Sequence, residues 1–422
     1  MRILFFTDNF LPESNAPAIR TFEHAREWVK AGHQVTVITC APNFPTGQVF
    51  PGYSNSLHAV ENRDGIKVVR VWTYISANEG SIKRVLDYFS YMFSATIAAL
   101  FMPRPDVVIG TSPQLFAAIG AWLTAKAKRV PFVFELRDLW PESILAVGAM
   151  RSGFWLTCLE RFVSFLYRQA DLMVPVTQAF ARVLRAEGVA SERIVVVTNG
   201  IEPGRHQSPL TPAEVRLRWG IPPDAFVGGF IGTLGMAHGV ATILQAAESS
   251  RGDDTLHYVI MGNGADKDQI KHIAAEKRLD NVSIIDGQPR QEALNLLGAI
   301  DASLVLLRDT PLFETVIPSK IFEAMEFGKP IVLGVRGESA DIVVNQSHSG
   351  IAITPESPAE LRAAMQRLRD DPELCAELGR NGQAAVTSEF RRTELAAKML
   401  AAIETTVVGA AAAAPGDTNT SA

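Results

Sequence analysis

A lysine and a glutamate three residues apart are the most informative feature of the sequence. Lys320 and Glu323 follow a proline–serine break in the segment 318–330, which reads PSKIFEAMEFGKP. Ser319 is a candidate N-cap and Gly328 a candidate stop, so the pattern predicts a short helix. Positions i and i+3 share a helix face, and a helix N-terminus favours anions. A cation for phosphates beside a carboxylate for two hydroxyls suits a nucleoside diphosphate. The alternative, a surface ion pair, would be preferred for an isolated Lys-x-x-Glu.

Two glycine-rich turns follow apolar runs in the same half of the chain. The first contains Gly232, Thr233 and Gly235, and the second begins at Gly262. Glycine lets backbone amides approach a phosphate closely. A tight strand-to-helix turn without a ligand is the alternative for each turn taken alone. The second turn is not a dinucleotide fingerprint, because Lys267 stands where the third glycine belongs. An oxidoreductase is therefore not expected.

Polar residues also cluster after two predicted strands of the first half. Strand ends in parallel α/β sheets border the ligand site, so both clusters are site candidates. Without that argument, each residue would be an ordinary loop or cap residue. The first cluster consists of Asn9, Glu13 and Arg20, and the second of Arg137, Asp138 and Glu142. In the second half, Glu338 and Ser339 follow a strand in the same way; Glu338 suits either a sugar contact or a helix cap.

Short apolar runs alternate with helical stretches along the whole chain, which is the pattern of parallel α/β units. Runs that are apolar throughout suit strands covered on both faces. The predicted strands of the first series are 3–7, 35–39, 68–72, 107–110, 132–136, 172–176 and 194–198. Those of the second series are 227–231, 258–261, 282–285, 303–306, 331–335 and 351–353.

A proline-rich stretch at 203–223 separates the two series and predicts a domain boundary. We expect two doubly wound, Rossmann-like parallel-sheet domains, at residues 1–205 and 206–388, facing a central cleft. A helix at 389–407 is expected to cross back to the first domain. The tail at 408–422 has a disordered composition.

Composition narrows the class of protein. The 422 residues carry a formal net charge of -5, which gives no support to nucleic-acid binding. Three cysteines lie far apart, as in a reduced cytoplasmic compartment, and no metal site or cofactor is predicted. The uncharged run at 88–103 is shorter than the roughly 20 residues of a membrane span. A buried helix is the favoured interpretation there and at 153–168, although flanking basic residues leave a membrane-surface helix open for both.

These features together resemble the retaining glycosyltransferases of family 4, which have the GT-B fold. The resemblance extends over nearly the whole chain and rests on an ordered set of motifs: AGHQVTVIT at 31–39, NGI at 199–201, FIG at 230–232, MGNG at 261–264 and PSKIFEAM at 318–325. Two further motifs, NFPTG at 43–47 and RDLWPES at 137–143, are similar to those of bacterial surface-polysaccharide enzymes. Some of those enzymes add N-acetylfucosamine-type sugars to a lipid-linked intermediate.

The resemblance implies roles for the candidate residues. Glu323 would hold the donor ribose and Lys320 the diphosphate, with Lys320, Arg137 and Asp138 as catalytic candidates. Donor contacts would come from Gly232, Thr233, Gly235, Gly262, Glu338 and Ser339. The acceptor side would be formed by Asn9, Glu13, Arg20 and the 137–142 loop. The implied partners are a nucleotide sugar and an undecaprenyl-diphosphate-linked saccharide at the cytoplasmic face of the inner membrane.

The sequence departs from the family pattern at three places. Relatives often have two glutamates with seven residues between them, whereas Glu314 and Glu323 have eight, and Thr315 occupies the expected position. The frequent Arg and Lys of the first glycine loop are absent, which leaves His238 as the candidate cation of that loop. Arg137 stands where a histidine often precedes the aspartate.

Three functions therefore remain open at this stage. Transfer of a sugar from a nucleotide donor, most simply a UDP-linked aminosugar, with retention at the anomeric carbon is the leading hypothesis. A nucleotide-sugar 2-epimerase has the same architecture and needs no acceptor. A binding or scaffold protein with a decayed site would bind the donor without turnover.

Overall fold

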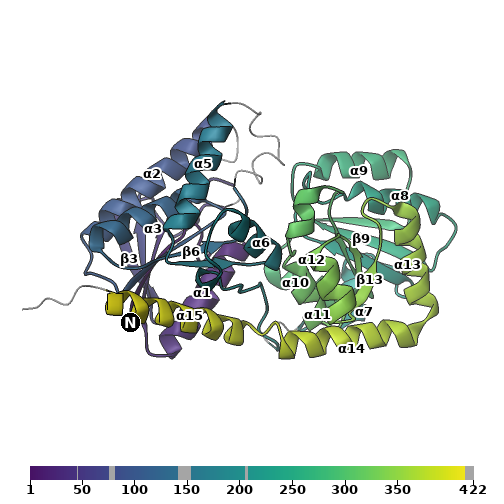
Figure 1. Ribbon diagram of the computed structural model, residues 1–422. Helices are drawn as coiled ribbons and strands as arrows, with labels where there is room; N and C mark the ends of the chain where they lie inside the picture. The colour runs from purple at the N-terminus through teal and green to yellow at the C-terminus, as the bar shows by residue number, and fades with distance from the viewer. Residues whose placement is uncertain (45, 76–80, 141–153, 205–207, 414–422) are drawn as a thin grey trace, which may run out of the picture. The chain divides into compact units, whose positions relative to one another are not determined.

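The computed structural model describes residues 1–44, 46–75, 81–140, 154–204 and 208–413. The chain divides into two compact units, Met1–Thr198 with Arg392–Ala422, and Asn199–Arg391 (Figure 1). The division falls before the boundary expected at 205 and after the one expected at 388. Each unit has its own sheet and its own hydrophobic core, and each is described by itself.

The first unit is built on a seven-stranded sheet with the order β3-β4-β2-β1-β5-β6-β7. Its strands are β1 (Arg2–Phe6), β2 (Gln34–Cys40), β3 (His58–Arg63), β4 (Ile66–Val71), β5 (Val107–Thr111), β6 (Phe132–Leu136) and β7 (Leu172–Pro175). Its helices are α1 (Ala16–Lys30), α2 (Ser81–Leu100), α3 (Leu115–Lys128), α5 (Phe154–Gln169), α6 (Gln178–Ala186), the 3₁₀ turn η1 (Ser191–Arg193) and α15 (Arg392–Ala413). All strand pairs are parallel except β3–β4.

The edge of this sheet differs from the sequence prediction. Strand β3 was not predicted, because its residues are polar and alternate between exposed and half-buried positions. It pairs with β4 through a turn at Asp64 and Gly65, which have φ angles of 50° and 83°. This Asp-Gly pair is a hairpin signal that the sequence analysis overlooked. The strand predicted at 194–198 is wrong, since Ile194 makes only an isolated bridge to Met173.

Helix α15 completes the first unit from the far end of the chain. Trp28 of α1 donates its indole N–H to the carbonyl oxygen of Ala396 at 2.9 Å, and Met399 and Ile403 lie buried in the sheet core. The helix is long and apolar enough to span a membrane by length and composition, but the side that carries Met399 and Ile403 packs inside the unit. It continues to Ala413, so the disorder predicted from 408 onward is wrong for 408–413.

The second unit is built on a six-stranded sheet with the order β10-β9-β8-β11-β12-β13, and every pair is parallel. Its strands are β8 (Phe226–Ile231), β9 (Leu256–Gly262), β10 (Val282–Asp286), β11 (Ala302–Leu306), β12 (Ile331–Gly334) and β13 (Gly350–Ala352). Its helices are α7 (Pro212–Arg218), α8 (Ala241–Ser249), α9 (Lys267–Glu276), α10 (Arg290–Ala299), η2 (Pro311–Thr315), α11 (Lys320–Glu326), α12 (Glu338–Ala340), η3 (Asp341–Gln346), α13 (Pro358–Asp370) and α14 (Pro372–Ser388).

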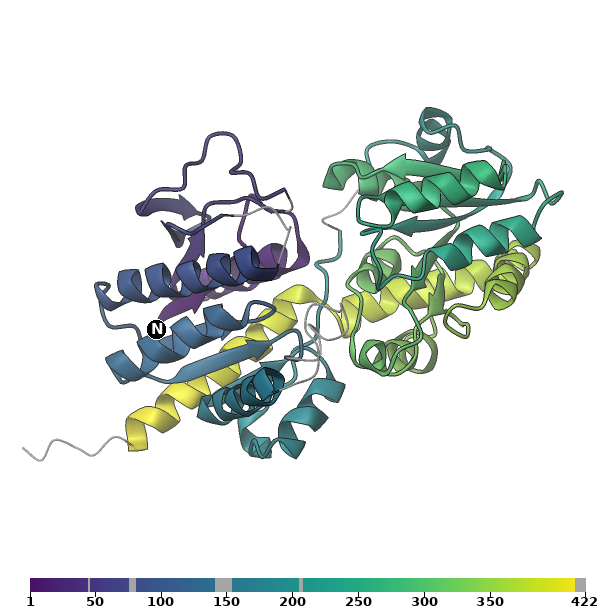
Figure 2. The same ribbon diagram turned by 90° about the horizontal axis from the view of Figure 1, so that it is seen from above.

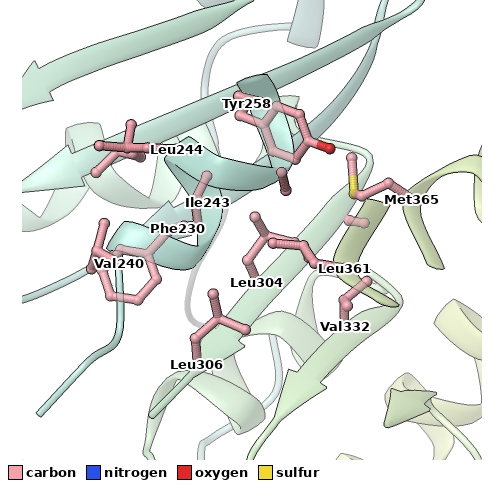
Figure 3. Packing of buried hydrophobic residues seen from close by; sticks show 14 of the residues in the cluster. Phe230, Val240, Ile243, Leu244, Tyr258, Leu304, Leu306, Val332, Leu361 and Met365 are labelled. Atoms are coloured by element: carbon pink, nitrogen blue, oxygen red, sulfur yellow. The ribbon is translucent and has the colours of Figure 1, made fainter. Parts of the chain in front are cut away.

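The core of the second unit explains why its strands are apolar on both faces. On one face, Phe230, Tyr258 and Leu304 pack against helical residues that include Ile243 and Met365 (Figure 3). On the other, residues of β8 and β9 pack against α10. Helices thus cover both faces of the sheet, and ligand chemistry is left to the loops at the strand ends.

Candidate functional site

Helix α11 carries Lys320 and Glu323. It begins at Lys320 and ends before Gly328, whose φ angle of 61° suits glycine. The expectation that Ser319 caps the helix is wrong, because Ser319 itself has helical φ and ψ angles and its side chain makes no capping hydrogen bond. The start of the helix is fixed instead by packing of Ile321 and Phe322 into the core.

Lys320 is a cation without a partner. Its Nζ atom is inaccessible to solvent, although the residue as a whole is only half-buried, and it has no hydrogen-bond partner among the described residues. It lies 3.8 Å from the centre of the Phe230 ring, and a Cβ atom at Gly232 would approach it to 2.9 Å. Burial lowers its pKa to about 8, while the more distant Glu323 carboxylate raises it. The amine is therefore held at the end of β8, beside the first glycine loop, and is available to an anion.

Glu323 forms an ion pair with a residue that the sequence analysis missed. Its Oε1 atom is 3.1 Å from Nη1 of Arg290, the first residue of α10. Arg290, Glu323 and Lys320 all line one pocket, together with Ile231, Ala293, Leu294, Leu297 and Ser303. Arg290 follows a Gly-Gln-Pro segment directly after a strand, and a cation at such a helix start was the signal that could have revealed it.

The two glycine turns are joined to one another. A Cβ atom at Gly262 would lie 1.8 Å from the carbonyl oxygen of Gly232, and one at Gly264 would lie 2.1 Å from that of Leu234. The amide of Leu234 donates to the carbonyl oxygen of Asn263 at 2.9 Å. These glycines are therefore required by close backbone approach, as the turn-without-ligand interpretation proposed. The amides of Thr233 and Gly235, however, donate no backbone hydrogen bond within the described ranges.

His238 is not the cation that the sequence analysis considered. Burial, and to a smaller extent the nearby Lys320, lower its pKa to about 4, so its imidazole is neutral at physiological pH. Its Nδ1 atom is buried and unpartnered in the described structure, and its ring packs edge-on against Phe230. A neutral imidazole at this position is a hydrogen-bond donor or acceptor rather than a charge.

The remaining donor candidates of this unit do not line the pocket: Gly232, Thr233, Gly235, Gly262, Glu338 and Ser339. Ser339 is fully buried, and its hydroxyl donates to the carbonyl oxygen of Val316 at 2.8 Å, so it holds the 311–317 segment. Glu338 begins the short helix α12 beside it. The hydroxyl of Thr315 donates to the carbonyl oxygen of Leu312, and the neighbouring Glu314 is exposed. The direct donor contact expected of Ser339 is therefore not supported by its position.

The first unit has its own cluster of buried charges at the ends of β1 and β6, two strands that both flank β5. The amides of Arg137 and Asp138 donate to Oγ of Ser112 at 2.7 and 3.1 Å. Both residues are partly exposed, yet loss of solvent around their charged groups lowers the pKa of Arg137 to about 10 and raises that of Asp138 to about 6. The Asp8 carboxyl interacts with Arg137 and also has a raised pKa because of burial.

Glu13 and Asn9 lie in the loop after β1. The Oε1 atom of Glu13 accepts hydrogen bonds from the amides of Asn43 and Phe44 at 2.8 and 2.9 Å, while its Oε2 atom is buried without a partner in the described structure. Burial raises the pKa of Glu13 to about 7. Asn9 accepts a hydrogen bond from Asn15, the N-cap of α1. Glu13 thus fastens the 43–47 motif to this loop.

Arg20 serves the interior of the first unit. Its guanidinium is buried, with Nε 2.8 Å from the Glu135 carboxylate and further hydrogen bonds to the carbonyl oxygens of Val197 and Thr198. The acceptor-facing position expected of Arg20 is therefore not supported. Glu142 lies outside the described residues. Among those residues, no group of three His, Cys, Asp or Glu is arranged to hold a metal ion.

Comparison with known proteins assigns each unit to a family. Residues 15–200 match the glycosyl transferase 4-like domain, and residues 213–385 match the glycosyl transferases group 1. A colanic acid biosynthesis glycosyl transferase named WcaI, from Escherichia coli, is 26% identical over 378 residues, covering 87% of this chain and 92% of its own. A lipopolysaccharide core biosynthesis glycosyltransferase named LpsD, from Rhizobium meliloti, is 25% identical over 60% of this chain and 73% of its own.

Solved structures show the same fold. HepE of Anabaena, in complex with UDP and glucose, superposes with a TM-score of 0.71 at 18% identity over 96% of this chain and 100% of its own. A sucrose-phosphate synthase from Thermosynechococcus elongatus superposes with a TM-score of 0.77 at 15% identity, over 97% of this chain and 100% of its own. The two α/β units have the GT-B glycosyltransferase fold, and the chain consists of a glycosyl transferase 4-like domain followed by a glycosyl transferases group 1 domain.

Proposed function

We propose that this protein is a retaining glycosyltransferase that moves a sugar from a nucleoside diphosphate donor, most simply a UDP-linked N-acetylated aminosugar, to a lipid-linked saccharide. The observation that carries the proposal is the pocket in the second unit, where an unpartnered, buried Lys320 lies beside the Arg290–Glu323 pair. A site of this kind offers cations to a diphosphate and a carboxylate to a ribose.

The chemistry follows from the charges of the site. When the bond between the anomeric carbon and the diphosphate breaks, negative charge develops on the leaving phosphate oxygens. Lys320 is a fixed donor for that charge, as are the amides of Thr233 and Gly235, which have no acceptor among the described residues. The stabilisation by these donors grows as water is excluded. Glu323, held by Arg290, is available to the two ribose hydroxyls. The donor is thus held at its ribose and at its diphosphate.

The acceptor class rests on the relatives. The Escherichia coli and Rhizobium meliloti proteins carry names from colanic acid and lipopolysaccharide core synthesis, respectively. By analogy we propose a role in bacterial surface-polysaccharide synthesis, with an undecaprenyl-diphosphate-linked saccharide as acceptor. The charged cluster of Asp8, Glu13, Arg137 and Asp138 in the first unit is the proposed acceptor side. The cytoplasmic face of the inner membrane stays the predicted location.

A product assay tests this function. Purified protein is incubated with a panel of UDP, GDP and dTDP sugars, each with and without short-chain polyprenyl-diphosphate-linked saccharides. We expect release of free nucleoside diphosphate and a saccharide that is one residue longer, and both only when acceptor is present. The new linkage should have the same anomeric configuration as the donor.

Three results would contradict the proposal in whole or in part. An epimeric nucleotide sugar formed from donor alone would identify an epimerase. Binding of a donor with no turnover against any acceptor of the panel would favour a scaffold protein. Inversion of anomeric configuration in the product would retain the transferase and refute retention.

A further inference from the structure

Helix α2 has an apolar stripe that faces solvent. Its members recur at intervals of four residues, which places them along one side of the helix and its C-terminal end. Their exposed fractions range from 41% to 89%, and the stripe consists of Val85, Phe89, Phe93, Ile97 and Phe101. Leu86 and Leu100 flank it and are also about half exposed. A single exposed apolar residue is ordinary, but a continuous row of them marks an interaction surface.

The opposite side of the same helix is already used. Tyr91, Ala95 and Ala99 are fully buried, and the Tyr91 hydroxyl donates to the carbonyl oxygen of Ile38 in β2 at 2.8 Å. The sequence analysis favoured a buried helix here because the uncharged run is too short to span a membrane. The structure corrects this interpretation: one side fills the core of the first unit, and the other is apolar without being needed for the fold.

Neighbouring helices extend the apolar surface. In the first unit, α2, α3 and α5 lie side by side on one face of the sheet (Figures 1 and 2). Phe89 of α2 contacts Phe116 of α3 edge-on, and Trp122 of α3 contacts Phe165 of α5 in the same way. Leu123, Phe162 and Phe165 are each more than a third exposed. We call these residues and the α2 stripe the α2–α5 surface.

The charge of this surface is opposite to that of the chain. The segments 81–106, 115–129 and 154–169 contain eight Lys and Arg and three Asp and Glu, a formal charge of +5, whereas the whole chain carries -5. Most exposed basic residues lie near the ends of the helices or on the connecting segments, namely Lys83, Arg84, Arg104, Lys126, Arg129 and Arg168, and Arg161 lies in the middle of α5. A basic rim around exposed aromatic and aliphatic side chains complements an anionic lipid surface.

We propose that the α2–α5 surface lies on an anionic lipid bilayer, with α2 in the plane of the interface and its stripe inserted among the acyl chains. A second copy of the chain fits the surface less well, because a symmetric pairing would bring two basic rims together. The inference rests on the first unit alone. It extends the proposed function by placing a membrane beside the unit that carries the proposed acceptor side.

Vesicle flotation with the full chain tests the proposal. The vesicles are phosphatidylcholine alone or phosphatidylcholine with phosphatidylglycerol, at low and high salt. The test variant is Phe93→Ser with Phe101→Ser, and the matched control is Leu57→Ser with Leu217→Ser, two residues that are 83% exposed outside the surface. We expect binding only to the anionic vesicles, weaker at high salt, and lowered by about tenfold or more in the test variant but not in the control.

Absence of wild-type binding to anionic vesicles, or equal binding of the two variants, would overturn the proposal. A wild-type dimer that the test variant converts to a monomer, measured by light scattering, would identify a second copy as the occupant and overturn it as well. Calorimetric binding of UDP in the same samples separates this test from the donor site. The test variant should bind UDP as the wild type does, so a failed donor site and a failed lipid surface give different results.

Discussion

At the scale of single residues, the proposed donor pocket depends on Lys320, whose amine the fold buries without giving it a hydrogen-bond partner among the described residues. The Lys320 amine contacts the Phe230 ring and has no hydrogen-bond partner in the part of the chain that the structure describes. Burial of an unpaired charge costs stability, and its ordinary outcome is a shifted pKa. Such a group contributes to function rather than to the fold, since an anion that enters the pocket supplies the missing partner.

Replacement of this amine should therefore separate activity from stability. Lys320→Met is expected to lower turnover by about a hundredfold or more, as for other residues that stabilise developing charge. The melting temperature should be unchanged or higher, because an unpaired charge is removed and a thioether still packs on the Phe230 ring. Initial rates and thermal melts measure both effects, with Lys271→Met, at an exposed ion pair, as the control. Wild-type turnover in Lys320→Met would refute the assigned role.

The lowered pKa of Lys320 predicts a pH dependence of donor binding. At pH values above about 8 the free amine loses its proton, so affinity for a diphosphate should fall as the pH rises through about 8. Between about pH 8 and the ordinary pKa of 10.5, the unfolded chain binds more protons at Lys320 than the folded chain does. The free energy of unfolding should therefore rise with pH over this range. Calorimetric titrations at several pH values measure the first effect. If donor affinity depended on pH in the same way in Lys320→Met, another group would be responsible for the dependence.

Asp138 in the first unit predicts the opposite pH dependence of stability: here the unfolding free energy should fall as the pH rises. Burial raises its pKa to about 6, so the folded state binds more protons between the ordinary 3.8 and about 6, and ionisation at neutral pH costs stability. Asp138→Asn should raise the melting temperature at pH 7, with a gain that shrinks as the pH falls below about 6, and should impair sugar transfer. Melts at several pH values, paired with rate measurements, check this prediction. A pH-independent gain, or normal transfer, would count against it.

At the scale of the elements, two neighbouring loops of the second unit need glycine where their backbones approach closely. Gly262→Ala would place a methyl group 1.8 Å from the Gly232 carbonyl oxygen, whereas Gly235→Ala meets only the Thr233 methyl group at 3.7 Å. The first change should cost about 1–3 kcal/mol of unfolding free energy, as overpacking does. The second should cost much less. Denaturant titrations followed by fluorescence compare the two, and equal costs would contradict this account of the loops.

The elements also show what could be predicted from the sequence. Strands such as β6 and β11 were predicted within a residue, because parallel strands covered on both faces are apolar throughout. Strand β3 was missed because a polar edge strand has no such signal. Arg290 was missed for another reason: its position beside Glu323 comes from the pairing order of the sheet, in which β11 and β9 both flank β8. Motifs within one loop are readable from sequence, whereas contacts between loops depend on topology.

At the scale of the whole molecule, the last helix belongs to the unit in which the chain begins. Ile403 of α15 is fully buried in the first unit, and Val408 of the same helix is exposed. Ile403→Ala should destabilise the first unit by about 2–5 kcal/mol, while Val408→Ala should change little. Denaturant unfolding of the full chain, monitored by hydrogen exchange in β1 and α1, makes the comparison. Equal effects of the two changes would argue that α15 does not pack on this core.

The central claim is that Lys320, Glu323 and Arg290 form a donor nucleotide site in the second unit. Calorimetry with UDP, GDP, ADP and dTDP tests it most directly, using the wild type, Glu323→Ala, Arg290→Ala and the exposed control Glu276→Ala. We predict micromolar binding of one nucleoside diphosphate, strongly weakened by either pocket substitution and unaffected by the control. Binding that survives both pocket substitutions, or binding of none of the four nucleotides, would contradict the claim.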